Sequence, residues 1–284
     1  MSRVPCVAFC HIEKAAGTSL IGALRKAFAL RFVALRPLSG PAGRLANAHD
    51  LKVVRRLNPW IRCVAGHAVV PHAGLQDAPD LKFISLLRDP VKRAASQYRF
   101  WVQRMGSSMT PEEYLEHPAS SNLQVRKIAG SDDVDAARRI VEKHFLLIGM
   151  VEQFDEFMVL LASRLGMPAE RFAYAPKNLA ASRGPLALPD GFEAALEERN
   201  RSDIELYRWV GSEVLPRMRD QAGIDLDEAT DAFRGACEAA GTGGLREWLD
   251  LAYRNAYMKP ATGAIRYAHG LNYAGTYAVR RGER

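Results

Sequence analysis

Several signatures that would assign a function at once are missing from this chain of 284 residues. No apolar run approaches the ~20 residues needed to span a bilayer, so we expect no stable membrane insertion. We find no internal repeat and no low-complexity segment, which argues against a solenoid or a disordered chain. The seven histidines show no H-x-x-x-H spacing and the four cysteines form no C-x-x-C pair, so the sequence predicts no metal.

The cysteines are few, and their positions argue against disulfides. Cys6 and Cys10 share a face of a predicted strand but lie too far apart along it to form a bridge. We therefore expect buried free thiols and a reducing compartment, and we predict a cytoplasmic protein.

Charge is distributed unevenly along the chain. Residues 1–104 contain 17 Lys/Arg and 5 Asp/Glu, whereas the remainder contains 22 and 27, for a net charge of +7. Such an asymmetry is typical of a protein whose first part meets an anion. A nucleic acid, a small polyanionic cofactor and a merely solvated basic face would all satisfy it.

Strand patterns alternate with helix patterns, as a parallel sheet with crossover helices requires. We predict an α/β fold with a P-loop-type central parallel β-sheet flanked by helices, in a domain of residues 1–222. A helical C-terminal extension, 223–284, is expected to pack on it. The expected strands are Cys6–His11, Arg31–Leu35, Ile61–Ala65, Leu81–Leu87 and Phe145–Met150. The expected helices include Ser19–Leu30, Leu45–Leu57, one beginning at Pro90, Pro111–Glu116, Asn122–Ala129, Asp133–Lys143, Glu152–Leu165, Phe192–Asn200 and Asp203–Arg217.

The segment CVAFCHIEKAAGTSLIGALRKAF reads as a strand, a short turn and an amphipathic helix. This is the layout of a phosphate-binding loop, although Lys14 precedes Gly17 and the usual order G-x-x-x-x-G-K-[ST] places lysine after the second glycine. A helix N-terminus offers unpaired N–H groups to a phosphate, Gly17 permits close approach, and Thr18 and Ser19 add hydroxyls. A capped helix with an exposed lysine is the alternative.

A second segment, FISLLRDPVKRAASQY, places Arg88 at the carboxyl end of a buried strand and Ser96 two turns into the next helix. Ligands of open α/β sheets bind at the carboxyl ends of strands, so Arg88 is expected beside the Lys14 loop. A guanidinium can bind a phosphate through two hydrogen bonds. Two such sites predict a ligand with phosphate groups at both ends. Pairing of Arg88 with Asp89, and Ser96 as a small packing residue, are the alternatives.

Together, FCHIEKAAGTSL and LLRDPVKRAASQY resemble the paired signatures of the sulfotransferases that use 3′-phosphoadenosine 5′-phosphosulfate (PAPS). The chain is most similar to their carbohydrate branch, which includes the 2-O-sulfotransferases. CVAGHAVVPHAG and SNLQVRKIAG are similar to further segments of that family, and the resemblance covers roughly residues 5–215. Glu13, Ala15 and Ala16 depart from the proline, threonine and glycine common there.

The resemblance implies a PAPS-dependent enzyme that releases 3′-phosphoadenosine 5′-phosphate (PAP) without a metal. It implies transfer of sulfate to a carbohydrate or another hydroxyl acceptor, such as an anionic polysaccharide, in polysaccharide biosynthesis. In the family, the arginine and the serine eight residues later, here Arg88 and Ser96, bind the 3′-phosphate. The first loop binds the 5′-phosphosulfate, which assigns that role to Lys14, Ala15, Ala16, Gly17, Thr18 and Ser19.

The catalytic residues that the resemblance implies are Lys14 and His67. Lys14 would stabilise charge on the departing oxygen, and His67, beside Gly66 at a strand end, would take the acceptor proton. A hydrogen-bonded histidine in the wall of the cleft is the alternative for His67. Other candidates for the base are His72, Glu13 and Glu152.

Further basic residues have two interpretations each. Arg183, with Lys177 and Asn178, lies in a loop that resembles the family's late cofactor-side segment. A basic residue of this loop could close over the nucleotide, or its charges could simply be solvated. Residues that recur on the helix after Asp89 could face an acidic acceptor or be ordinary surface charges; they are Arg93, Arg99 and Arg104.

Two other classes of function remain open at this point. An atypical P-loop phosphotransferase would show the G-K-[ST] order and an acidic metal ligand at a strand end, and we find neither. A non-catalytic module that binds PAP or another nucleotide is permitted by the basic N-terminal part. No aromatic-rich stacking strand accompanies that part, so we expect no nucleic acid partner. The acceptor and the oligomeric state are not predicted.

Overall fold

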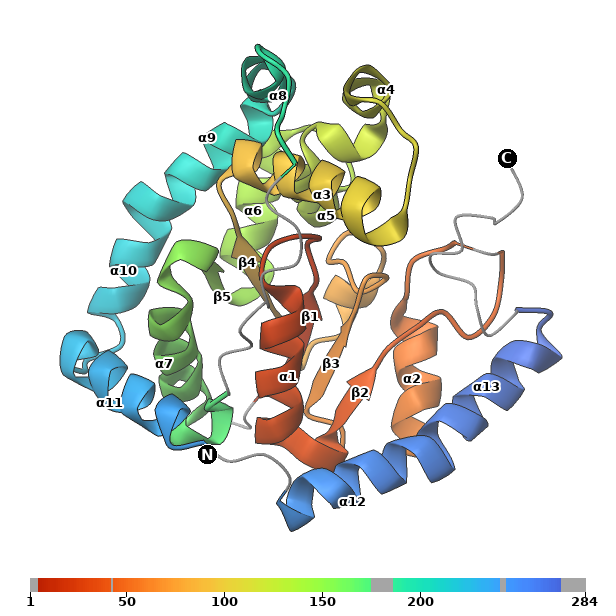
Figure 1. Cartoon of the computed structure of the whole chain (residues 1–284). Helices are drawn as coiled ribbons and strands as arrows, with labels where there is room; N and C mark the ends of the chain where they lie inside the picture. Colours follow the sequence, from red (N-terminus) through yellow and green to blue (C-terminus); the bar gives the residue numbers. More distant parts are fainter. Residues whose placement is uncertain (1–4, 42, 175–185, 241–243, 272–284) are drawn as a thin grey trace.

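A computed structural model describes the chain except for residues 1–4, 42, 175–185, 241–243 and 272–284 (Figure 1). Its centre is a five-stranded sheet in the order β2-β3-β1-β4-β5, in which every neighbouring pair is parallel. The strands are β1 Cys6–Cys10, β2 Phe32–Ala34, β3 Cys63–Gly66, β4 Leu81–Leu87 and β5 Phe145–Met150. The α/β class and the parallel sheet are thus confirmed.

Strand β1 occupies the middle of the sheet, and all five of its residues are buried. After β1 the chain forms β2 and β3 on one side, and it then crosses over to form β4 and β5 on the other. The change of direction falls between β1 and β4, which are hydrogen-bonded neighbours. The segments that follow these two strands therefore leave the same edge of the sheet side by side, where α/β folds place their ligands.

Helices cover both faces of the sheet, and alternate residues of β1 point to opposite faces. Val7 and Phe9 pack in one apolar cluster with helices α1 Gly17–Phe28, α7 Phe154–Leu165 and α11 Leu226–Glu238. Ala8 and Cys10 pack in another with α2 Ala48–Leu57, α5 Leu123–Ala129, α6 Val134–His144 and α9 Arg201–Trp209. The two clusters form one core on each side of the sheet (Figure 1).

A third apolar cluster lies beyond the carboxyl edge of the sheet. It joins α3 Pro90–Met105, α4 Pro111–Glu116 and α8 Phe192–Arg199 through Tyr98, Tyr114 and Phe192. Figure 1 shows these helices above the ends of β1 and β4. They supply one wall of the region where the strands end.

The last part of the chain is helical. Helix α9 continues through a π-helical turn at Val210–Val214 into α10 Leu215–Asp220, and α11 packs against α7. Helices α12 Leu245–Tyr253 and α13 Lys259–Ala268 are joined by a π-helical turn and run past β2 and α2 (Figure 1). Arg266 of α13 donates a hydrogen bond to the carbonyl of Pro37, which ties this arm to the segment after β2. No helix of the described residues is both long and apolar enough to cross a membrane.

The element bounds follow the sequence closely where capping signals are strong. Strands β4 and β5 and helix α4 have the predicted bounds, and Asp89 caps α3 by accepting a hydrogen bond from Lys92 N at 2.8 Å. All four cysteines are buried and free, as expected. The division at residue 222 stays a prediction.

Candidate functional site

The loop between β1 and α1 has an unusual backbone. Lys14 and Ala16 both adopt the left-handed conformation, with φ of 67° and 53°. Helix α1 begins at Gly17 with no side-chain cap and no acidic residue in its first turn. Its first N–H groups are therefore not engaged by a capping side chain, and they carry the positive end of the helix dipole.

The ring of His11 packs against this loop and fixes where helix α1 can begin. Its ring is stacked between Phe9, at 5.4 Å, and His67, at 4.1 Å between ring centroids. A Cβ atom added to Gly17 would lie 1.9 Å from His11 Nε2, so only glycine allows the helix to begin against this ring. Burial, followed by the neighbouring His67, lowers the pKa of His11 to about 4. His11 is thus a neutral packing group at neutral pH.

Glu13 joins the loop to two other segments of the chain. Its Oε1 lies 3.0 Å from Lys127 Nζ on α5 and 3.2 Å from His67 Nδ1 after β3. Lys127 Nζ also donates to the carbonyl of His67 at 3.1 Å. The side chains of Glu13 and Lys127 are only 16% and 15% exposed, whereas that of His67 is 38% exposed. The backbone of His67 is therefore held by Lys127 and its Nδ1 faces the Glu13 carboxylate, while part of its ring faces outward.

Arg88 leaves the end of β4 with its backbone held by a buried glutamine. Arg88 N donates to Gln124 Oε1 at 3.0 Å, and Gln124 Nε2 donates to Arg88 O at 2.9 Å. Asp203 in turn accepts from Gln124 N and Val125 N at 3.1 and 2.8 Å, and so caps α5 from a distant helix. The Arg88 guanidinium then donates from Nη1 to the carbonyl of Lys14 at 3.1 Å. The two predicted anion-binding segments are in direct contact.

The Lys14 ammonium group lies beside α3. Its Nζ is 4.2 Å from the centre of the Phe100 ring, a cation–π arrangement. Burial, and then the positive charges of Arg88 and Arg104, lower the pKa of Lys14. Burial among other cations favours binding of an anion, because an anion would offset the repulsion.

The other predicted residues lie around this centre in different environments. Ala15 is buried, Ala16 and Ser19 are half-buried, and Thr18 is exposed in the first turn of α1. Ser96 is half-buried in the second turn of α3. Arg183, with Lys177 and Asn178, lies outside the described residues.

The alternative bases lie in the wall or on the surface. His72 Nδ1 is 3.4 Å from the carbonyl of Ile128, and burial lowers its pKa. Glu152 is exposed and accepts a long hydrogen bond of 3.4 Å from Asp89 N. Neither contacts Lys14 or Arg88 among the interactions described above, whereas Glu13 is engaged by His67 and Lys127.

The interpretation of Arg93 as a surface charge is wrong. Its side chain is fully buried, and its Nη2 donates to the carbonyl of Ala119 at 2.9 Å. Burial lowers its pKa. Arg93 therefore cannot face an acceptor, whereas Arg99 is half-buried and Arg104 exposed. The helix pattern did not predict this burial, because the 3₁₀ turn Pro118–Ser120 and the apolar cluster of α4 and α8 cover this face of α3.

Sequence reasoning missed several residues that hold the site together. They are Lys127, Gln124, Phe100 and Asp203. A signal for two of them was present, since Gln124 and Lys127 belong to the segment SNLQVRKIAG that was singled out. Nothing local to Asp203 shows that it caps another helix.

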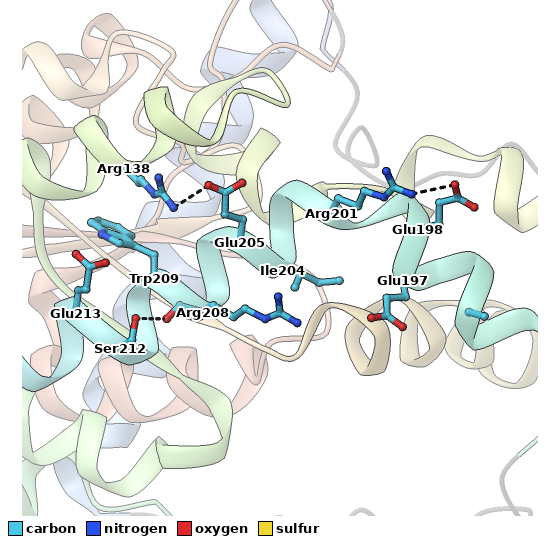
Figure 2. A pocket seen from close by; sticks show the side chains of 11 residues that line it. Arg138, Glu197, Glu198, Arg201, Ile204, Glu205, Arg208, Trp209, Ser212 and Glu213 are labelled. Atoms are coloured by element: carbon cyan, nitrogen blue, oxygen red, sulfur yellow. Dashed lines mark hydrogen bonds and ion pairs between the residues drawn. The ribbon is translucent and has the colours of Figure 1, made fainter.

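A groove on another part of the described surface lies away from this site. Figure 2 shows this open groove of about 770 Å³ along the outer side of α9, where Glu205 pairs with Arg138 at 2.9 Å and Glu198 with Arg201 at 3.2 Å. None of its lining residues belongs to the Lys14–Arg88 site. Two of its three arginines already pair with glutamates, so it is a weaker candidate for binding an anion.

Comparisons with known proteins do not add to this picture. No protein-family model matches the chain, and a search of curated proteins finds no match. Among the described residues, no group of three or more His, Cys, Asp or Glu side chains is arranged to hold a metal ion.

Proposed function

We propose that this chain is a sulfotransferase that moves a sulfuryl group from PAPS to an acceptor hydroxyl on a carbohydrate. The observation that carries the proposal is the hydrogen bond of 3.1 Å between the Arg88 guanidinium and the Lys14 carbonyl. This hydrogen bond joins the segments that follow the adjacent strands β1 and β4, and the sequences of these segments resemble the two parts of a PAPS site. A P-loop-type role for the first segment is part of the same proposal.

The residues present fit a ligand that is anionic at both ends. Uncapped N–H groups at the start of α1 and the left-handed residues Lys14 and Ala16 form the kind of backbone concavity that binds a phosphate. Arg88 offers guanidinium N–H groups at the end of the neighbouring strand, and Ser96 lies in the second turn of the helix that follows it. PAPS supplies an activated sulfuryl group, and these residues would bind its 5′- and 3′-phosphates respectively.

His67 is the group that we assign as general base. With a proton on Nδ1, facing the Glu13 carboxylate at 3.2 Å, the Nε2 atom keeps its lone pair. Nε2 then takes the proton of the acceptor hydroxyl while the acceptor oxygen bonds to sulfur and the bond from sulfur to the nucleotide oxygen breaks. Glu13 is a positioning residue in this scheme, since it orients the ring and stabilises the imidazolium that forms.

Lys14 is the group that we assign to the leaving oxygen. Its ammonium group would move from the Phe100 ring to the negative charge that develops on the departing phosphate. Burial and neighbouring cations lower its pKa, and binding of an anion would raise that pKa again and favour the charged form.

Two measurements test the proposal in sequence. Titration calorimetry should show that PAP binds without metal and more tightly than ATP with magnesium, and labelled sulfate should pass from PAPS into an acceptor in a carbohydrate-containing extract. Binding of PAP with no transfer to any acceptor would indicate a non-catalytic module. Preference for ATP with magnesium would indicate a phosphotransferase.

The role of His67 has its own test. His67→Ala should lower turnover by about 10²-fold or more and leave PAP binding intact, because the base contacts the acceptor and not the nucleotide. Glu13→Gln should lower turnover less and should alter the pH profile, as a positioning residue does. Near-normal turnover of His67→Ala would remove the histidine from the role.

A further inference from the structure

A second cavity lies on another side of the molecule, between edge strand β2 and the C-terminal helices. It has a volume of about 230 Å³ and is lined by β2, α1 and α2 on one side and by α12, α13 and the turn between them on the other. None of its lining residues belongs to the Lys14–Arg88 site. Figure 1 shows α12 and α13 along the β2 and α2 side of the fold, away from α3 and α8.

The cavity gathers positive charge. Five of its described lining residues are cationic and one, Asp250, is acidic; the cations are Arg25, Arg36, Arg254, Lys259 and Arg266. Asp250 is 9% exposed, and burial raises its pKa, which weakens it as a counter-charge. Arg25, Arg36, Arg254 and Lys259 form no ion pair within the described part of the chain, although surface arginines elsewhere in the fold form many.

The cations are positioned rather than scattered. The Arg25 guanidinium lies 4.8 Å from the centre of the Phe32 ring, and Arg266 donates to the carbonyl of Pro37. Arg254 Nε is buried and has no hydrogen-bond partner among the described residues, and the same is true of Tyr253 Oη. Buried donors without acceptors are unfavourable, so the neighbourhood of the cavity carries uncompensated donors as well as unpaired charge.

Apolar side chains line the cavity as well. Val33, Leu38, Val54 and Met258 are all buried and line it together with Phe32. A hydrated inorganic ion would leave these apolar side chains unused, whereas a neutral apolar molecule would leave the cations unpaired. The volume is smaller than the ~300 Å³ and above typical of drug-sized ligands.

We propose that the cavity between β2 and the α12–α13 arm binds a small organic anion, with a carboxylate, sulfate or phosphate against the arginines and a compact apolar body against Met258. The site is separate from the Lys14–Arg88 site, and the proposal does not depend on the sulfotransferase function. Arg36 and Lys259 are exposed at its mouth and would meet the charged end of the ligand first.

The test uses phenyl phosphate as the probe and a local readout. In protein labelled with ¹³C at methionine methyl groups, the Met258 resonance, identified by its loss in Met258→Leu, should shift saturably as phenyl phosphate is added. Inorganic phosphate and phenol, which each carry half of the recognised chemistry, should bind at least ~10-fold more weakly. Because the readout is local, binding at the Lys14–Arg88 site does not interfere.

Variants at the exposed mouth decide the role of the cations. Arg36→Gln combined with Lys259→Gln should weaken phenyl phosphate binding by ~10-fold or more and leave the fold intact, while Arg56→Gln, an exposed arginine of α2 outside the cavity, should not change it. Either of two results would overturn the proposal: no saturable shift of Met258 up to about 10 mM phenyl phosphate, or equal binding of phenol.

Discussion

Helices α1 and α2 lie on opposite faces of one sheet, and their first turns are stabilised differently. Helix α2 begins with a complete capping box, in which Asn47 accepts from Asp50 N at 3.2 Å and Asp50 accepts from Asn47 N at 3.0 Å. Asp50 is fully buried and is also bound by both Nη atoms of Arg44 at 2.7 Å. Helix α1 has neither a capping side chain nor an acid in its first turn.

The two helix starts differ in whether the protein itself fills the anion position. The protein's own carboxylate fills the anion position at the start of α2, so that end is closed and structural. The start of α1 keeps two non-glycine residues in the left-handed conformation, an arrangement that costs roughly 1 kcal/mol or more per residue and that proteins keep at functional sites. The helix dipole that stabilises folding in one case is left available for a ligand in the other.

The largest effect is expected at the start of α2, where Asp50 fills the anion position. Asp50→Ala should lower the free energy of unfolding by about 3 kcal/mol or more, because it leaves Arg44 unpaired in a partly buried position and removes acceptors from Leu38 N and Asn47 N. Urea unfolding measures this. Asp80→Ala, which breaks the exposed pair with Arg55, is the control and should change stability by less than ~1 kcal/mol. Equal losses in the two variants would remove the distinction between a closed helix start and a surface pair.

The second effect is the pH dependence of stability that His11 causes beside the uncapped start of α1. Folding lowers the pKa of His11 from 6.5 to about 4. Between these two pH values the unfolded chain therefore binds a proton at His11 that the folded chain does not bind. Stability should therefore fall as the pH drops below 6.5 and level off below 4, by about 3 kcal/mol in total. Urea unfolding at pH 7.5 and 4.5 should show a smaller loss in His11→Phe, which cannot be protonated. An equal loss in both proteins would place the acid sensitivity elsewhere.

Turnover should depend on Lys14, in the loop that leads into α1. Lys14→Ala should lower sulfuryl transfer by about 10²-fold, since one donor to the leaving oxygen is lost, and should leave thermal stability unchanged. Lys92→Ala removes an equal charge from the exposed surface of α3 and should retain activity. Unchanged turnover of Lys14→Ala would refute its assignment to the leaving oxygen.

The smallest effect concerns backbone strain. Ala16→Gly should raise the free energy of unfolding by about 1 kcal/mol, because glycine adopts φ of 53° without steric strain. Ala15→Gly, one residue earlier and outside the left-handed region, should instead destabilise the protein. If Ala16→Gly is destabilising as well, the left-handed backbone is not a source of strain.

Much of the fold was predictable because its signals are local. Strands β4 and β5 are mostly apolar runs, and Asp89 and Pro90 mark the start of α3. Asp203, by contrast, was expected to open a helix, but the helix already begins at Arg201 and the Asp203 carboxylate caps α5 instead. A side chain that serves a distant element gives the same local pattern as one that serves its own.

The site was predictable to the level of its segments but not of its contacts. The pattern of neighbouring strand ends sufficed to place the Lys14 loop beside Arg88. The contact of Glu13 with Lys127 joins residues that meet only through packing of α5 on the sheet, and no periodicity reports it. The prediction that Arg93 lies on the surface failed for the same reason, because its burial depends on elements that pack over α3 from elsewhere in the chain.

The hydrogen bond from Arg266 to the carbonyl of Pro37 connects residues that are 229 positions apart. During synthesis, β2 is therefore made long before the arm that lies against it. Until α13 emerges from the ribosome, one edge of the sheet is open to pairing with other nascent chains. A chain truncated before α12 should therefore aggregate more readily than the chain that includes α12 and α13, although the shortness of β2, at three residues, limits the effect.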